Sequence, residues 1–188
     1  MQSTQQNSVT KVVALAGRRT DASDTQTSRF PLKSIERVKK ELQHLFLAAR
    51  TEKLVCSAAC GADLVALEVA GELGIERHVI IPFSVPEFRR ISVTDRPGAW
   101  GPLYDQVMAA VSAQGLLQLL GRDTTDDAAF SVTNKAIIKQ AQLLAGGAIP
   151  LAVVVWEGES QEPIDATREF LRLARQAEFE AQTIISVK

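Results

Sequence analysis

The chain has 188 residues, of which 46% are hydrophobic and 23% are charged, and its net charge is −1. This length allows one well-buried α/β domain but not two of comfortable size. General binding to nucleic acid or to a membrane surface needs a basic excess, so we expect neither of them as a partner. The longest apolar runs have the length of strands, and no segment resembles a signal peptide or a membrane span, which predicts a cytoplasmic protein.

The first part of the chain predicts a leader, a strand and a helix. Residues 1–10 are polar and predict a disordered leader, whereas residues 11–188 predict a single domain. Residues 11–16 form an apolar run typical of a buried strand. A polar loop at residues 20–30 leads to residues 31–49, where Pro31 begins a helix with apolar residues on a single face.

The segment from Leu54 to Phe83 predicts a strand, a helix and a second strand. Because such crossovers are right-handed, the two strands should be parallel, with the Ser57 to Gly61 turn at their carboxyl edge. Small residues there leave backbone N–H groups open at a helix N-terminus, which predicts a site for an anion such as phosphate. The alternative is that Gly61 only permits a tight turn.

The second half of the chain continues the alternation. Residues 84–102 predict a long irregular connection, of the kind that forms lids over binding sites. A short helix follows, and then a strand at residues 115–120. Residues 128–144 predict a helix that is apolar enough to form a homo-oligomer interface. Residues 150–156 predict a central strand, and residues 183–187 follow a last helix as an edge strand.

This alternation predicts the α/β class: a three-layer Rossmann-like fold, with a mostly parallel sheet of about six strands and helices on both faces. Ligands bind such sheets outside the carboxyl ends of the strands. Arginines suited to phosphate gather in the loops of that edge. They are Arg18, Arg19, Arg29, Arg89, Arg90, Arg96 and Arg122. Phe83, Trp100 and Trp156 offer flat faces for a base, so we expect a nucleotide; the alternative is ordinary loop arginines and core aromatics.

Several of these segments together resemble a known family. They are Gly17-Arg18, the S-A-A-C-G-A-D segment from Ser57 to Asp63, Pro82-Phe83, and the F-R-R-I-S-V segment from Phe88 to Val93 with Trp100 after it. The chain is similar here to the SLOG superfamily of DNA-processing protein A and lysine-decarboxylase-like Rossmann domains, and most of all to its bacterial sensor-type members.

The resemblance implies binding of a nucleotide-derived signal, such as an ADP-ribose-like species or a cyclic nucleotide. Its pocket positions match Gly17, Arg18, Ser57, Gly61, Ala62 and Asp63. With the residues that follow the other strands, the expected ligand-binding set is Gly17, Arg18, Arg19, Ser57, Ala58, Gly61, Ala62, Asp63, Pro82, Phe83, Arg89, Trp100, Trp156 and Thr167.

One motif of the enzymes in this family is degraded. Phosphoribohydrolase members carry P-G-G-x-G-T-x-x-E, whereas residues 162–170 read E-P-I-D-A-T-R-E-F, which retains only Thr167. Glu169 stands one residue from the family glutamate, about 100° around a helix, and should point elsewhere. We therefore expect a binding protein more than an enzyme.

Other catalytic or metal-binding patterns are weak. His44 and His78 accompany no serine or cysteine nucleophile in sequence. Cys56 and Cys60 have neither the spacing of a redox pair nor that of a zinc site, and Asp63 suits a ribose hydroxyl or its own helix N-terminus. We predict no catalytic residue, metal or cofactor other than a nucleotide ligand.

The sequence thus predicts a protein that binds or senses a nucleotide-derived ligand and signals through it. Two alternatives remain at this stage. One is a phosphoribohydrolase that cleaves the N-glycosidic bond of a nucleoside monophosphate. The other is single-stranded DNA binding, against which the near-neutral charge counts.

Overall fold

The computed structural model describes residues 11–160 and 164–187, so the predicted leader at residues 1–10 lies outside the described part. A six-stranded sheet forms its centre, with the strand order β4-β3-β2-β1-β5-β6. Every neighbouring pair of strands is parallel. The predicted Rossmann-like α/β fold is therefore confirmed, with a sheet that is parallel throughout.

The order of the strands reverses beside β1. From β1 the chain adds β2, β3 and β4 on one side, and it then returns to add β5 and β6 on the other side. The carboxyl ends of β1 and β5 therefore flank the position where a crevice opens in folds of this class. Gly17 ends β1 and Trp156 ends β5.

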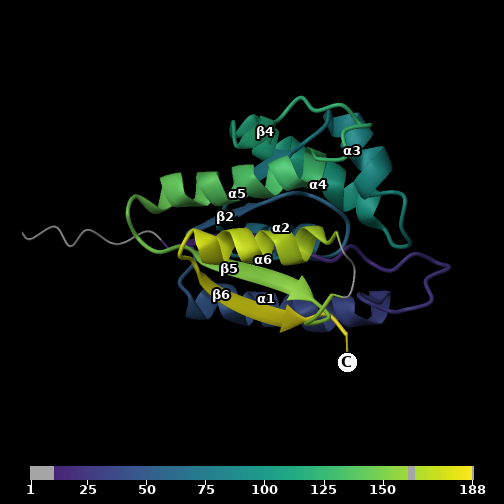
Figure 1. The fold of residues 1–188 in the computed structure, drawn as a ribbon, viewed down its shortest axis with the longest axis horizontal. Helices are drawn as coiled ribbons and strands as arrows, with labels where there is room; N and C mark the ends of the chain where they lie inside the picture. The colour runs from purple at the N-terminus through teal and green to yellow at the C-terminus, as the bar shows by residue number, and fades with distance from the viewer. Residues whose placement is uncertain (1–10, 161–163, 188) are drawn as a thin grey trace, which may run out of the picture.

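Helices cover both faces of the sheet (Figure 1). Alternate residues of β1 face opposite ways: Val13 and Leu15 pack with α1, α2, α3 and α4, whereas Val12 and Ala14 pack with α5 and α6. All of β5 is buried, as a central strand between two helical layers should be. The strands are β1 Val12–Gly17, β2 Lys53–Cys56, β3 Glu76–Ile81, β4 Leu117–Leu119, β5 Leu151–Trp156 and β6 Glu180–Ile185. The helices are α1 Ile35–Ala48, α2 Ala62–Glu72, α3 Val85–Ser92, α4 Trp100–Ala113, α5 Ala129–Ala145 and α6 Ala166–Gln176, with a 3-10 turn at Leu32–Ser34 before α1.

The predicted irregular connection at residues 84–102 is wrong. Ser84 is the N-cap of α3, and a proline lies in the first turn of this helix. The Ser84 hydroxyl donates to the Glu87 carboxylate at 2.5 Å. Phe88 is fully buried and stacks on Tyr104, with ring centroids 6.3 Å apart. A helix of 8 residues with so few core positions is too short to show a periodic pattern, so no apolar repeat indicates it.

Two smaller differences concern the ends of elements. α4 begins at Trp100, so the helix predicted after Pro102 starts earlier and is longer than expected. β6 begins at Glu180, because pairing with β5 and not an apolar pattern extends this exposed edge strand. Gly146 follows α5 in a left-handed conformation, with φ of 58°, so the helix ends one residue beyond the predicted residue 144.

Candidate functional site

Two adjoining pockets lie at the carboxyl edge, where the strand order reverses. The first, here called the arginine pocket, has a volume of about 520 Å³ and is lined by Gly17, Arg18, Arg19, Thr20, Asp21, Thr25, Thr27, Arg29, Arg96, Ala166 and Thr167. The second, here called the apolar pocket, has a volume of about 330 Å³ and is lined by Leu15, Ala16, Gly17, Arg19, Ser57, Ala59, Asp63, Phe88, Ile91, Ser92, Phe130, Thr133, Asn134, Ile137, Ala166 and Thr167. They share Gly17, Arg19 and the first residues of α6, so a single ligand can reach both.

Gly17 allows the close packing at the base of both pockets. A Cβ added there would lie 2.4 Å from the Ala62 Cβ and 2.8 Å from the Val155 carbonyl oxygen. The glycine therefore lets the start of α2 and the end of β5 approach β1 closely. This requirement comes from packing and holds whether or not a ligand is present.

Arg18 is held in a buried ion-pair cluster. Its Nε and Nη2 donate to the two Glu157 oxygens at 2.6 and 2.7 Å, and Nη2 also donates to Asp165 at 2.6 Å. Burial disfavours charge on the guanidinium, but the bonds to these carboxylates outweigh it and raise the Arg18 pKa. Burial acts against the Asp165 carboxylate too, yet hydrogen bonds from Arg18 and other donors lower its pKa to about 2. Arg18 thus ties the ends of β1 and β5 to the start of α6.

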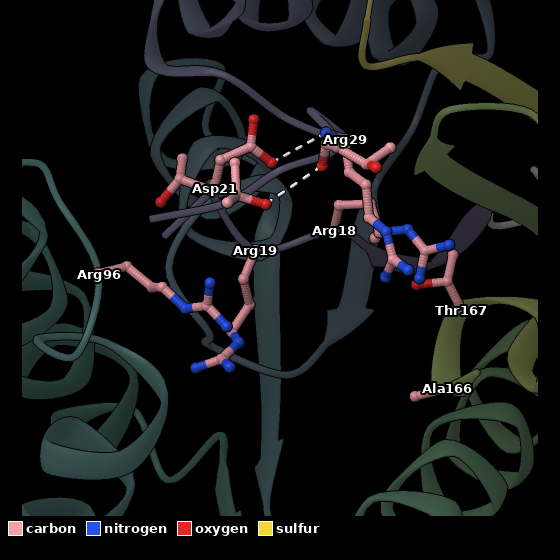
Figure 2. Close-up of a pocket in the computed structure, with 11 residues that line it drawn as sticks. Arg18, Arg19, Asp21, Arg29, Arg96, Ala166 and Thr167 are labelled. Carbon is pink, nitrogen blue, oxygen red and sulfur yellow. Dashed lines mark hydrogen bonds between the residues drawn. The ribbon is translucent and has the colours of Figure 1, made fainter. Parts of the chain in front are cut away.

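Arg19 and Arg96, which line the arginine pocket (Figure 2), are held more loosely than Arg18. The Arg19 guanidinium donates to the Asp95 carboxylate at 2.7 Å and to the Ile91 carbonyl at 3.1 Å. The Arg96 Nε lies 3.5 Å from the same Asp95 oxygen. These side chains are 26 to 33% exposed, and exposed ion pairs contribute only about 0–1 kcal/mol. An incoming phosphate can therefore replace Asp95 at little cost.

The loop at residues 20–30 forms the outer wall of the arginine pocket. Asp21 organises it: its carboxylate accepts the backbone N–H groups of Arg29 and Phe30, each at 2.9 Å, and the Ser28 hydroxyl at 2.7 Å. Burial opposes the charge, but these hydrogen bonds lower the pKa of Asp21. Figure 2 shows the hydrogen bond between Asp21 and the Arg29 backbone, and the Arg29 side chain beside Arg18 and Thr167. Arg29 also lies 3.6 Å from Glu157.

The apolar pocket contains one buried carboxyl group, that of Asp63. This residue is 7% exposed, and one of its oxygens accepts the Ala59 backbone N–H at 3.2 Å. Burial raises the pKa of Asp63 to about 7, against the opposing effect of that hydrogen bond. Phe130 also lines this pocket; it is 43% exposed and meets Phe83 edge to face, with centroids 5.9 Å apart.

The start of α2 is covered by the chain itself. The Ala62 N–H donates to the Arg18 carbonyl at 3.0 Å, and Gly61 and Ala62 are buried. A Cβ on Gly61 would lie 2.6 Å from that carbonyl oxygen. The turn from Ser57 to Gly61 therefore carries the loop after β1 against α2, and only Ser57 and Ala59 of this turn line a pocket.

The expected ligand-binding residues fall into three groups. Some line one or both pockets: Gly17, Arg18, Arg19, Ser57, Asp63 and Thr167. Others form the buried packing beneath them: Ala58, Gly61 and Ala62. The remainder line neither pocket: Pro82, Phe83, Arg89, Trp100 and Trp156.

The three aromatic residues expected to offer flat faces to a base are buried. Phe83 is 2%, Trp100 6% and Trp156 7% exposed, so each ring packs against the core. Arg89 lies on α3 and pairs with Asp105 through two bonds of 2.8 and 2.9 Å. The open ring beside the pockets belongs to Phe130, which the sequence reasoning missed because it reads as one of several apolar positions at the start of α5.

Glu169 faces α5 and lines neither the arginine nor the apolar pocket. It accepts the Ser131 hydroxyl at 2.7 Å and lies 3.4 Å from the Asn134 amide nitrogen. This agrees with its expected rotation away from the position of the family glutamate. Glu162 and Pro163, at the start of the degraded motif, lie outside the described residues, whereas Thr167 lines both pockets.

Neither metal ligands nor membrane spans stand out in the described part of the chain. Over residues 11–160 and 164–187, no three His, Cys, Asp or Glu side chains gather in a way that would hold a metal ion. In the same residues no helix combines the length and apolar character needed to cross a bilayer.

Solved structures with a similar fold come from proteins that handle DNA. DNA processing protein A from Streptococcus pneumoniae matches with a TM-score of 0.57 and 15% identity, over 93% of this chain and 50% of that one. The chain thus spans about half the length of that protein. A structure on the single-stranded DNA binding mode of DNA processing protein A from Helicobacter pylori matches with a TM-score of 0.43 and 13% identity. This match covers 92% of the present chain and 75% of the Helicobacter chain. No family model and no curated protein matches the sequence.

The comparison defines the fold class as Rossmann-like, of the kind found in DNA processing protein A. It also corrects the expectation that nucleic acid is not a partner. The Streptococcus pneumoniae structure with this fold is that of a DNA processing protein, so the fold does not count against nucleic acid. The expectation rested on net charge, which averages over the whole surface, whereas Arg18, Arg19, Arg29 and Arg96 gather at one edge.

Proposed function

We propose that the arginine pocket and the apolar pocket together bind one nucleotide unit of single-stranded DNA. Its phosphate would lie at Arg19 and Arg96, and its base beside Phe130. The two adjoining pockets support this, since one is polar and rich in arginine and the other is mostly apolar. The similar fold of DNA processing protein A points the same way. Membership of the SLOG superfamily belongs to the same proposal, because the Gly17-Arg18 and Ser57 to Asp63 motifs lie at this edge.

The observation that carries the proposal is the arrangement of Arg19, Arg96 and Asp95. Two guanidinium groups share one partly exposed carboxylate at the mouth of the arginine pocket. A phosphate can accept from both guanidinium groups once Asp95 has moved away, and charge-assisted bonds of this kind are among the stronger ones in proteins. Arg18 is the opposite case, because its partner Asp165 is fully buried and its other partner Glu157 is only 18% exposed.

Phe130 supplies the second half of the recognition. Its ring is the one that lies open beside the apolar pocket, and its edge-to-face contact with Phe83 fixes its orientation. Base–aromatic stacking contributes about 1–3 kcal/mol per base without depending on sequence. Phe130 and the two loosely held arginines together suit a strand of mixed sequence.

The second candidate is a free nucleotide or nucleotide-derived signal, the sensor role predicted from the sequence. The modest size of the apolar pocket favours it, since about 330 Å³ lies at the lower end of the range for small-molecule sites. A free nucleotide would use the same arginines and the same ring. The two candidates differ in how affinity depends on the length of the strand and on salt.

Fluorescence anisotropy with labelled strands of about 15 nucleotides tests the proposal. We expect binding that weakens with salt, with a slope of about −0.7 for each phosphate contacted. Arg19→Gln should weaken it about tenfold, and Arg50→Gln should not, because Arg50 lines a pocket at the opposite edge with Lys11 and Glu180. Equal loss in both variants, or binding to mononucleotides alone, would overturn the single-strand proposal.

Asp95→Asn is a variant that should strengthen binding. It removes the carboxylate that competes with phosphate for Arg19 and Arg96, so we expect affinity for the strand to rise a few-fold. If the Asp95→Asn variant instead binds the strand more weakly, Asp95 supports the site and does not compete with the ligand.

A further inference from the structure

The apolar pocket holds a buried carboxyl group with an unused oxygen. Asp63 is 7% exposed and lies in the first turn of α2. One oxygen accepts the Ala59 N–H, and the other has no hydrogen-bond partner in the described part of the chain. No basic side chain among the described residues forms an ion pair with Asp63. Among the described residues, the buried side-chain atoms that lack a partner are Thr51 Oγ1 and Trp156 Nε1, so this second Asp63 oxygen is not sealed in the core but is open to the apolar pocket.

The oxygen of Asp63 that accepts the Ala59 N–H has a structural role. A carboxylate in the first turn of a helix is favoured by the helix dipole, and the bond from Ala59 steadies the turn after β2. That role uses one oxygen. The other belongs to a side chain that lines the apolar pocket together with Phe130, Thr133 and Ile137.

We propose that Asp63 reads the base that enters the apolar pocket, and that it selects a base with two adjacent N–H donors, as guanine presents on its Watson–Crick edge. The inference rests on the proposed function, because it assigns the base specificity of the same site. Phe130 at the pocket holds the ring of the base, and Asp63 accepts from its edge.

The chemistry of the bases makes guanine the best fit. Its N1–H and N2–H groups point the same way and match the two oxygens of a carboxylate, because the oxygen that accepts the Ala59 N–H keeps a second lone pair. Adenine and cytosine offer one amino group each, beside a ring nitrogen that only accepts. Thymine offers a single N3–H between two carbonyl oxygens, which repel a carboxylate. A good bidentate contact discriminates by about 1–3 kcal/mol, or roughly tenfold to a hundredfold.

The protonation of Asp63 makes the preference depend on pH. Burial raises its pKa to about 7, and only the ionised form accepts from both donors of the base. The charged and titratable groups that share its surroundings are Arg19, which lines the same pocket, and the Cys56 thiol below it. Burial raises the pKa of Cys56 well above its usual value, so this thiol stays neutral. The preference for guanine should therefore increase as pH rises through about 7.

The test compares short thymidine strands that carry one central guanine, hypoxanthine, adenine or thymine. Hypoxanthine keeps N1–H and lacks the N2 amino group. With the whole protein at about pH 8, we expect the guanine strand to bind about tenfold more tightly than the hypoxanthine strand, with less preference at about pH 6. Asp63→Asn should lose the preference for guanine and its pH dependence, whereas the control Arg50→Gln, at the opposite edge of the sheet, should keep both.

The outcomes separate this inference from the proposed function. Binding of all four strands with equal affinity would overturn the role of Asp63 and leave single-strand binding in place. A guanine preference that survives in Asp63→Asn would overturn it as well. Binding of none of the strands would overturn the proposed function and the inference with it.

Discussion

Two helices begin beside the pockets, and their aspartates are treated in opposite ways. At the start of α6, Asp165 accepts the Arg168 N–H and pairs with Arg18, and its pKa falls to about 2. At the start of α2, Asp63 forms no ion pair with any described residue, and burial raises its pKa to about 7. One carboxylate therefore holds the fold together, whereas the other is left to the pocket. Similar residues at similar places can serve structure or binding according to their partners.

The largest effect should come from breaking the ion-pair cluster of Arg18, Glu157 and Asp165. Arg18→Ala removes the cation that pairs with the fully buried Asp165 and the partly buried Glu157, so we expect a loss of about 4 kcal/mol in the free energy of unfolding. Arg19→Ala breaks an exposed pair and should cost at most about 1 kcal/mol. Urea unfolding of both variants measures the difference. Equal small losses would show that the Arg18 cluster contributes little.

The raised pKa of Asp63, at the start of α2, can be tested by measuring stability at several pH values. A carboxyl group whose pKa is about 7 when folded and near 4 when unfolded binds more protons in the folded state, so its contribution to stability falls as pH rises from about 4 to about 7. Asp63→Asn lacks this dependence. Its stability relative to wild type should therefore rise by about 3 kcal/mol across that range, as thermal or urea unfolding at several pH values would show. A constant difference would contradict the raised pKa.

Glycine substitutions can test how tightly the loop after β1 packs against the start of α2. Gly61 has φ of 91°, and a Cβ there would meet the Arg18 carbonyl oxygen at 2.6 Å. Gly74 has φ of 71°, but its Cβ position has no atom within 4 Å. We expect Gly61→Ala to cost about 3 kcal/mol and Gly74→Ala about 1 kcal/mol, since only the first adds a clash to the backbone strain. Similar losses in both would mean that the loop after β1 moves away easily.

The sequence predicted much of the fold because its strands and longer helices carry clear apolar patterns. Residues 11–16, 54–83 and 150–156 gave the central strands and the βαβ unit, and the arginines after β1 were placed at the right edge. The short helix α3 was missed because it contributes few residues to the core.

The details of the site depended on partners far apart in sequence. Small residues from Ser57 to Gly61 predicted an open helix N-terminus, but no local pattern shows that the loop after β1 covers it. Likewise Arg18 reads as a phosphate ligand until Glu157 and Asp165, from β5 and α6, are seen to hold it. Net charge was the least informative signal, since a whole-chain sum hides an arginine cluster at one edge.

The most direct test of the central claim is where a single strand touches the protein. A thymidine strand carrying iodouracil, irradiated in complex with the full chain and mapped by mass spectrometry, should crosslink at Phe130, the open ring beside the apolar pocket. The crosslink should disappear in Arg19→Gln at equal protein concentration, because the strand then binds weakly. Crosslinks confined to the opposite edge of the sheet, around Arg50 and Glu180, would contradict the account.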